Sequence, residues 1–340
     1  MRFLFLGAGA IGTYVGGSLA AAGEDVTFIE RPETAEVIAA HGLKVHTKNT
    51  TRVVKNVTVH PTAAEALEAG PYDIGVFALK SFDTQTALDE LVATGHDVPT
   101  ILSLQNGVDN ESTIAATLGA EKVLAGTVAT AVSKPGVGEV VEEKHRGIGV
   151  ALGHRHSEAL VSALDAAGLS GRAFKQAASM KWSKLLTNLT GNATSAILDT
   201  TVADLFADKR TYALEVAVLA ECLAVMKARG YKVVDLPGTP VRALALATRL
   251  PRIIAQPALT RALGSGRGDK MPSFHIDLHG GRGRTEVSFL NGAVARHGVD
   301  LGIPTPVNAL LNDTLEALSS GEQDVETYRH NPEALLSQLR

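Results

Sequence analysis

The sequence predicts an α/β domain followed by an all-α domain, and two observations carry this prediction. Up to about residue 172, short apolar β-rich runs alternate with helical segments. From about residue 173 the chain consists of long helical runs. We therefore expect one domain at residues 1–172 and another at residues 173–340, each long enough to bury its own core.

The first 23 residues hold the most informative motif. An apolar strand at residues 3–6 runs into a glycine-rich turn, and an alanine-rich helical stretch then continues to Gly23. In this order Gly7 lets the chain turn tightly, Gly9 lets backbone approach a pyrophosphate, and Gly12 lets the helix pack on the strand. The helix N-terminus also offers unpaired N–H groups to an anion. The motif predicts a Rossmann-type dinucleotide-binding domain with the cofactor residues Gly7, Ala8, Gly9, Ala10, Ile11 and Gly12.

The remaining β-rich runs predict the rest of a sheet. The second strand, at residues 25–29, ends in Glu30-Arg31, where such folds recognise the cofactor ribose. Alternation with helices implies a mostly parallel sheet covered on both faces, with antiparallel strands after about residue 123, where helices no longer intervene. Further strands are expected at 44–47, 53–59, 74–79, 100–104, 123–129, 138–142 and 148–152, and helices at 62–69, 84–93, 110–118 and 157–167.

The second half predicts a helical domain. Its expected helices lie at 176–197, 208–229, 240–250, 285–297 and 305–319. The glycine-containing segment 256–272 is expected to be a loop. The single cysteine, Cys222, lies in an apolar helical run and is expected to be a buried core thiol.

Composition limits the partners and the compartment. With 45% hydrophobic and 20% charged residues the chain reads as globular, and a net charge of −4 gives no reason to expect a nucleic acid. One cysteine excludes an intramolecular disulfide framework and suits the cytoplasm. We expect no membrane span, because apolar runs of about 18 residues are missing. We expect no metal either, and interpret His275, His279 and His297 as scattered surface histidines.

One predicted helix carries a polar stripe. Lys184, Asn188 and Asn192 are spaced four apart beside a core face that includes Trp182. Solvated faces usually carry Glu, Lys and Arg, and asparagine is a poor helix former, so the stripe favours ligand binding over a solvated face. Lys181, one turn earlier, has no asparagine four residues further on, so its replacement is expected to change turnover only mildly.

Other candidate residues lie at strand ends and at a helix start. Lys80 and Asn106 each follow an expected strand, at the edge where open α/β sheets bind ligands. A solvated lysine and an Asn-Gly turn are the alternatives. Thr285 is expected to be a helix N-cap with Glu286 in the first turn, which leaves Glu286 either a dipole-stabilising or a catalytic carboxylate.

Taken in order, these residues resemble the ketopantoate reductase (2-dehydropantoate 2-reductase) family over nearly the whole chain. The resemblance rests on the GAGAIG turn, Arg31, Leu79-Lys80, Gln105-Asn106-Gly107, Lys184-xxx-Asn188-xxx-Asn192, Ser273-xxx-Asp277, Thr285-Glu286 and Leu290-Asn291-Gly292. It implies an oxidoreductase that reduces a 2-oxo acid with NADPH, most directly 2-dehydropantoate to pantoate in pantothenate biosynthesis.

The resemblance also implies roles for individual residues. Lys184 would be the general acid and Glu286 the second catalytic residue, which with Ser273 holds the substrate. Asn106, Asn188 and Asn192 would line the same site. Arg31, Lys80 and Asn106 would lie at the NADP(H) cofactor. The expected partner is a small 2-oxo acid, and a homodimer is one assembly that the sequence leaves open.

Departures from the family pattern leave alternatives open. The chain is one residue longer between Asp277 and Glu286, and the stretch 264–270 looks like an elaboration. Both flank the substrate side, so another small or branched 2-oxo acid remains an alternative substrate. Glu30 lies near the place where NAD-binding folds put a carboxylate, which leaves NADH open. A non-catalytic NAD(P)-binding sensor is the alternative from another class.

Overall fold

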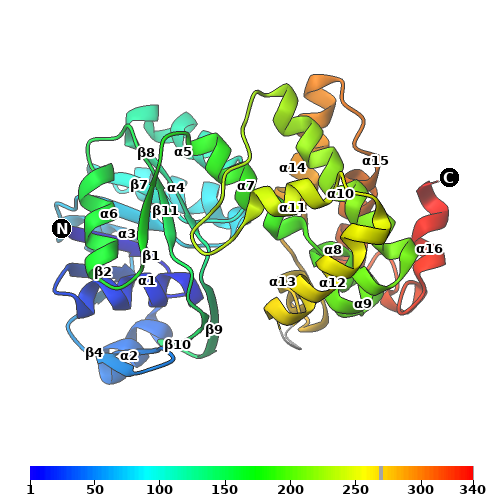
Figure 1. The fold of residues 1–340 in the computed structure, drawn as a ribbon. Helices are drawn as coiled ribbons and strands as arrows, with labels where there is room; N and C mark the ends of the chain where they lie inside the picture. Colours follow the sequence, from blue (N-terminus) through cyan, green and yellow to red (C-terminus); the bar gives the residue numbers. More distant parts are fainter. Residues whose placement is uncertain (268–270, 340) are drawn as a thin grey trace. The chain divides into compact units, whose positions relative to one another are not determined.

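The computed structural model describes residues 1–267 and 271–339, and these form two compact units (Figure 1). Unit 1 comprises Met1–Lys181 together with Leu236–Thr239. Unit 2 comprises Trp182–Asp235 and the chain from Pro240 onwards. The division falls inside helix α7 (Ala177–Leu189), whereas the sequence places the domain boundary before it, at residue 172.

Unit 1 is built on an eight-stranded sheet. Its order is β12-β11-β8-β7-β6-β1-β2-β5, and the strands from β8 to β5 are all parallel. β11 runs antiparallel to β8, so the predicted mostly parallel sheet with later antiparallel strands is confirmed. The bounds are β1 Arg2–Leu6, β2 Asp25–Ile29, β5 Thr58–His60, β6 Ile74–Phe77, β7 Thr100–Ser103, β8 Val123–Val128, β11 Ile148–Ala151 and β12 Gly171–Phe174.

Helices cover both faces of this sheet and bury its side chains. Along β1, Phe3 and Phe5 enter one core cluster, whereas Leu4 and Leu6 enter another. This alternation is what a strand buried on both faces requires, since successive side chains point to opposite faces. The helices of unit 1 are α1 Ala10–Ala21, α2 Pro32–His41, α3 Ala63–Glu68, α4 Thr84–Ala93, α5 Asn110–Leu118 and α6 Ser157–Ala166, with a short helix η1 at Ser81–Asp83 and another, η2, at Ala120–Lys122.

A second, four-stranded sheet in unit 1 is absent from the sequence prediction. Its order is β4 (Thr51–Val54), β3 (Leu43–His46), β10 (Glu139–Lys144) and β9 (Ala131–Gly136), and it packs against α1 (Figure 1). The run 53–59, expected as one strand, is split because Val54 ends in the small sheet and Thr58 begins β5 in the large one. Strands β9 and β12 and helix α2 were not predicted at all.

Unit 2 is helical, as predicted, and the apolar face predicted for residues 176–197 is buried in its core at Trp182, Leu185, Leu186, Leu189, Ala193 and Ala196. Cys222 within it is fully buried, which raises the pKa of its thiol and confirms the core interpretation. The elements after α7 are α8 Asn192–Leu198, α9 Val202–Ala207, α10 Lys209–Ala228, α11 Val241–Ala247, α12 Arg252–Arg267, α13 Ser273–His279, α14 Val287–Leu301, α15 Pro306–Ser320, η3 Val325–Thr327, α16 Pro332–Leu336 and η4 Ser337–Leu339.

The single helix expected at 176–197 is wrong, because the chain forms α7 and α8 with a break between them. Gly191 takes a left-handed conformation with φ +64° at this break. Buried Glu215 of α10 accepts hydrogen bonds from the Gly191 N–H at 2.6 Å and from the Thr194 hydroxyl at 2.5 Å. A carboxylate at a helix N-terminus is stabilising, so a residue distant in sequence decides where α8 begins.

The loop expected at 256–272 is also wrong as far as Arg267, because α12 continues to that residue. Tertiary contacts outweigh the poor helix propensity of its glycines and of Pro257. The Gln256 side-chain amide donates to the Phe206 carbonyl at 3.0 Å, and the Thr260 hydroxyl donates to it at 2.9 Å. Residues 268–270 of the expected loop lie outside the described residues.

Membrane insertion finds no support among the helices. In the part of the chain that the structure describes, none of them combines the length and the apolar character needed to cross a bilayer.

Candidate cofactor and substrate residues

Four candidate residues follow neighbouring parallel strands of the large sheet. Leu6 of β1 pairs with Ile29 of β2 and with Phe77 of β6, and Phe77 in turn pairs with Ser103 of β7. The strands therefore end level with one another. The residues that follow them, Gly7, Glu30, Lys80 and Asn106, emerge at one carboxyl edge, where open α/β sheets bind ligands.

The glycines of the first turn serve different purposes. Gly7 has φ +91°, which a residue with a Cβ rarely adopts. A Cβ on Gly12 would lie 2.1 Å from the Gly7 carbonyl oxygen, so only glycine allows α1 to start there. Gly9 differs, because its φ is −65° and a Cβ would meet only the Ala78 carbonyl oxygen, at an ordinary 3.9 Å. The protein itself does not require glycine at position 9, which fits a close approach by a ligand.

The start of α1 suits a pyrophosphate. Gly9 is its N-cap and provides no side-chain cap for the first N–H groups of the helix. No acidic residue lies in the first turn. The Lys134 ammonium, on β9 of the small sheet, donates to the Ala8 carbonyl at 3.0 Å. A cation and helix N–H groups together favour a bound anion, so this turn fits the phosphates of a dinucleotide. Lys134 escaped the sequence analysis because its strand was not predicted.

Glu30 and Arg31 face different surroundings. The Glu30 carboxylate accepts hydrogen bonds from the N–H of Ala8 and, at 3.2 Å, from that of Arg31. The carboxylate thus lies against the glycine turn, where NAD-binding folds use one for ribose hydroxyls. Arg31 is exposed, and among the described residues its guanidinium has no hydrogen bond or ion pair. It can therefore accept a phosphate without breaking an existing contact.

A buried network holds the turn that contains Asn106. The Asn106 carbonyl accepts from the Ser81 hydroxyl at 2.9 Å and from the Asn110 side-chain amide at 2.6 Å. The Gln105 amide donates to the Thr84 hydroxyl at 2.8 Å. Because Ser81 follows Lys80 directly, the same network joins the two candidate residues at the ends of β6 and β7. The main chain of Asn106 is therefore fixed before any ligand binds.

Lys181 anchors this turn from α7, contrary to expectation. Its side chain is only 4% exposed, and its ammonium forms an ion pair with Glu111 of α5 at 2.8 Å. It also donates to the carbonyls of Gln105 at 2.8 Å and Gly126 at 3.3 Å. Breaking a buried ion pair by removing one partner is costly, so we expect replacement of Lys181 to lower stability, whereas its predicted mild effect on turnover stays a prediction.

The polar stripe is interrupted in unit 2. Lys184 and Asn188 lie four residues apart on α7, but Asn192 belongs to α8 beyond the break at Gly191. Asn192 is buried, and its side-chain carbonyl accepts from the Phe274 N–H at 3.1 Å at the start of α13. Its amide donates to the Ser273 hydroxyl at 3.3 Å. The structure thus brings the candidate residues Asn192 and Ser273 together.

The start of α14 is shifted by one residue from the prediction. Glu286, not Thr285, occupies the N-cap position, and its side chain caps no helix N–H. The Thr285 hydroxyl accepts from the Val287 N–H at 3.4 Å. Glu286 is only 4% exposed. Helix capping therefore does not hold the Glu286 carboxylate in place.

Of the three histidines interpreted as scattered surface residues, His279 is exposed as expected, but it lies beside His275, and His275 and His297 are half-buried. The rings of His275 and His279 lie side by side with centroids 4.2 Å apart and planes tilted by 34°, and the His275 Nε2–H donates to the Asp199 carboxylate at 2.7 Å. His297 packs edge-on against Trp182 at 5.1 Å. The four-residue spacing of His275 and His279 was visible in the sequence. Asp199, which joins them, could not be found without the fold.

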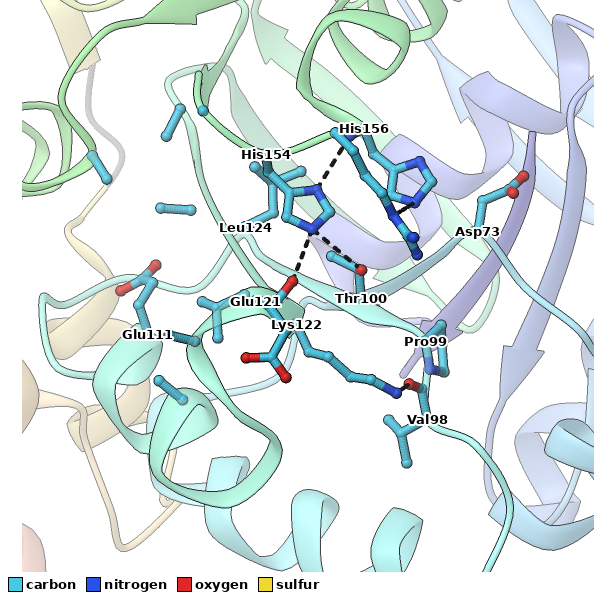
Figure 2. Close-up of a pocket in the computed structure, with 18 of the residues that line it drawn as sticks. Asp73, Val98, Pro99, Thr100, Glu111, Glu121, Lys122, Leu124, His154 and His156 are labelled. Atoms are coloured by element: carbon cyan, nitrogen blue, oxygen red, sulfur yellow. Dashed lines mark hydrogen bonds between the residues drawn. The ribbon is translucent and has the colours of Figure 1, made fainter.

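A large cavity in unit 1 lies at the opposite edge of the sheet (Figure 2). It measures about 1000 Å³ and is lined where β7 and β8 begin, at Thr100 and Val123. His154 donates from Nε2 to the Glu121 carbonyl at 2.9 Å and accepts the His156 N–H on Nδ1 at 3.2 Å, which together orient its ring. Burial, followed by nearby Arg155, lowers the pKa of His156. None of the candidate residues lines this cavity in the described part of the chain.

Comparison with protein families decides the relationship. The family model described as ketopantoate reductase PanE/ApbA matches residues 3–152, and the model of the C-terminal part of the same family matches residues 176–319. The chain belongs to the ketopantoate reductase family. Membership confirms the resemblance inferred from the sequence motifs, as well as the predicted Rossmann-type domain followed by a helical domain.

Individual relatives of the ketopantoate reductase family match along nearly the whole chain. The 2-dehydropantoate 2-reductase of Pyrococcus horikoshii is 29% identical over 326 residues, covering 94% of this chain and 98% of the relative. That of Archaeoglobus fulgidus is 28% identical over 324 residues, with the same coverage. A crystal structure of a ketopantoate reductase from Ralstonia eutropha superimposes with a TM-score of 0.80 at 30% identity, covering 95% of this chain and all of that one.

Proposed function

We propose that this protein is an NADPH-dependent oxidoreductase that reduces 2-dehydropantoate to pantoate. The observation that carries the proposal is the family match over both parts of the chain. One matched region holds the glycine turn and the other holds Lys184, Asn188, Asn192, Ser273 and Glu286. A protein that only sensed the cofactor would have no need of this second set.

The proposed cofactor-binding residues belong to unit 1. Bound NADPH supplies a hydride to the substrate carbonyl. The first N–H groups of α1 and the Lys134 ammonium bind its pyrophosphate, and Arg31 pairs with the 2′-phosphate. Lys80 and Asn106, on the turns that Ser81 and Asn110 hold in place, complete this edge.

The proposed substrate residues, in unit 2, supply the proton and orient the substrate. Hydride attack builds negative charge on the ketone oxygen, and an ammonium group can neutralise that charge and then protonate the oxygen. Lys184 fills this role. Asn188 and Asn192 donate hydrogen bonds that orient the substrate, and the Ser273 hydroxyl binds the 2-oxo acid carboxylate. Glu286 binds a substrate hydroxyl and serves as the second catalytic residue.

Cofactor preference follows from the two residues after β2. The exposed Arg31 guanidinium favours NADPH, because a charge-assisted bidentate pair with a phosphate is strong. Glu30 would disfavour NADPH only if its carboxylate faced the 2′-phosphate. Its carboxylate accepts from the Ala8 N–H, at the place where NAD-binding folds use a carboxylate for ribose hydroxyls, and this keeps NADH as the alternative cofactor. NADPH is therefore the preferred cofactor, with NADH as a weaker one.

Steady-state kinetics test the proposal directly. Oxidation of NADPH and of NADH is followed with 2-dehydropantoate and with a panel of small and branched 2-oxo acids. We expect the highest kcat/KM with NADPH and 2-dehydropantoate. A higher value with another 2-oxo acid would reassign the substrate while keeping the reaction. Turnover of none, with cofactor binding intact, would favour a sensor.

Assembly and location complete the proposal. The enzyme acts on a small molecule, binds no nucleic acid and works in the cytoplasm, which suits its single cysteine. A homodimer is the assembly to be tested, by light scattering at working concentrations.

A further inference from the structure

Three side chains with the donor atoms that transition metals prefer meet where α8 ends against α13. Asp199 is the C-cap residue of α8, and His275 and His279 lie on α13. Each offers one ligand atom, and these atoms all lie within 4.8 Å of one another. We infer that unit 2 carries a binding site for a divalent transition-metal ion, of which Zn²⁺ is the representative.

The two histidines are placed by helical geometry. Residues four apart lie on one face of a helix, so His275 and His279 point the same way, with ring centroids 4.2 Å apart. Asp199 reaches them from the neighbouring helix, because α8 and α13 pack together (Figure 1). Two imidazoles and one carboxylate suit zinc, iron, cobalt or nickel better than magnesium or calcium, which prefer oxygen ligands.

The carboxylate is already oriented toward the histidines. Its Oδ1 accepts the His275 Nε2–H at 2.7 Å, whereas its Oδ2 accepts from Arg329 Nε at 3.1 Å. A partner on the outer oxygen fixes the orientation of a ligating carboxylate, as outer-shell contacts do in metal sites. Arg329 therefore leaves Oδ1 as the oxygen that faces the ion.

The spacing of the donors is close to that of a coordination shell. Donors bound to zinc at 2.0–2.1 Å in tetrahedral geometry lie about 3.3 Å apart. The three donors lie at most 4.8 Å apart, so no pair needs to close by more than about 1.5 Å on binding, whereas His275 Nε2 and Asp199 Oδ1, at 2.7 Å, would open slightly. Asp199 and His275 are 22% and 14% exposed, and His279 is exposed, so water can fill the remaining position.

His279 is the residue that distinguishes a metal site from an ion network formed by Asp199, His275 and Arg329 alone. Asp199, His275 and Arg329 would satisfy one another without it. His279 instead donates to the Ala196 carbonyl at 3.1 Å, yet its ring lies next to that of His275, with a donor atom within 4.8 Å of the carboxylate. A metal needs His279 as a ligand, whereas the ion network does not.

A bound ion would fasten two helices that carry candidate substrate residues. α8 begins with Asn192 and α13 begins with Ser273, and these two residues already contact each other. The ion would join the later parts of the same helices. The inference rests on the geometry of unit 2 alone and is independent of the proposed function.

Metal binding is tested on the full chain without a histidine tag, after chelator treatment. Isothermal titration with Zn²⁺ should show one ion per chain, and Co²⁺ should give a visible absorption spectrum of a nitrogen- and oxygen-ligated ion. His279→Gln should weaken binding by at least about tenfold, since loss of even an outer-shell partner costs 10- to 100-fold. His96→Gln, at an exposed histidine of unit 1, is the matched control and should bind as the parent does.

Two results would overturn the inference. One is the absence of saturable binding of Zn²⁺ or Co²⁺ by the parent protein. The other is equal affinity in His279→Gln and the parent, which would assign the ion to another place. Because His275 is only half-buried but bonds Asp199, a fold check by circular dichroism accompanies His275→Gln, and the result for the exposed His279 is decisive.

Discussion

The glycine turn and the α7–α8 region are both predicted by clear patterns in the sequence. The structure confirms the first prediction and contradicts the second. In the glycine turn, β1, the turn, α1 and β2 follow one another within 30 residues, and each piece formed where it was expected. In the α7–α8 region a regular four-residue spacing suggested one helix, and the chain made two.

The difference lies in where the deciding contact comes from. The Gly7 carbonyl that makes glycine necessary at position 12 is only five residues away, so the contact that shapes the turn lies within the motif itself. The break at Gly191 depends on Glu215, 24 residues further along the chain. Periodicity describes a continuous helix, and it gives no warning when a distant carboxylate caps a new one.

The largest expected effect tests Lys184 as the proton donor. Lys184→Ala should lower kcat by about 10²- to 10⁴-fold, the contribution of a positioned general acid, with little change in cofactor affinity. Lys175→Ala is the matched control, because Lys175 is exposed just before α7. If both variants stay within a few-fold of the parent, Lys184 only solvates its helix. The assay is steady-state NADPH oxidation.

A second experiment sharpens the contrast between the two lysines of α7. Lys181→Met should lower the free energy of unfolding by about 3–5 kcal/mol, because it leaves Glu111 without its ion-pair partner. Urea denaturation followed by circular dichroism measures this loss. In the same titration Lys184→Ala should have an unfolding free energy close to that of the parent. Equal losses of stability in the two variants would contradict the assignment of Lys181 as a structural anchor and Lys184 as the proton donor.

The glycine turn offers a test of its own logic. Gly12→Ala should cost about 1–3 kcal/mol of stability, because its Cβ would meet the Gly7 carbonyl. Gly9→Ala should leave the unfolding free energy within about 0.5 kcal/mol, since the surroundings accommodate the methyl group. Only cofactor affinity should fall in Gly9→Ala, as measured by fluorescence titration with NADPH. Unchanged affinity there would mean that the phosphates do not approach this residue.

The smallest effects separate the two cations proposed at the cofactor. Arg31→Ala should weaken NADPH binding by about 10- to 100-fold and leave NADH nearly unchanged, since only NADPH has the 2′-phosphate. Lys134→Ala should weaken both cofactors by a similar factor of up to about fivefold, because an exposed charge contact is weak and the pyrophosphate is common to both. The ratio of Kd values for the two cofactors is the measurement. An unchanged ratio in Arg31→Ala would reject the phosphate contact.

The sequence by itself determined the features of the fold that depend on short stretches of chain. The order of strand, glycine turn and helix, the mostly parallel sheet and the helical second half all follow from local periodicity and turn chemistry. The motif residues from Gly7 to Glu286 were also available from the sequence, because family motifs are contiguous patterns. Their chemical roles remain predictions.

Only the tertiary structure decided the contacts between distant segments. The small sheet brings Lys134 to the glycine turn, α7 brings Lys181 to the Gln105 carbonyl, and Glu215 accepts the Gly191 N–H where α8 begins. Asp199 likewise meets His275 across 76 residues of sequence. Burial and hydrogen bonding at such places depend on which elements pack together, and that information is absent from the local pattern of any one segment.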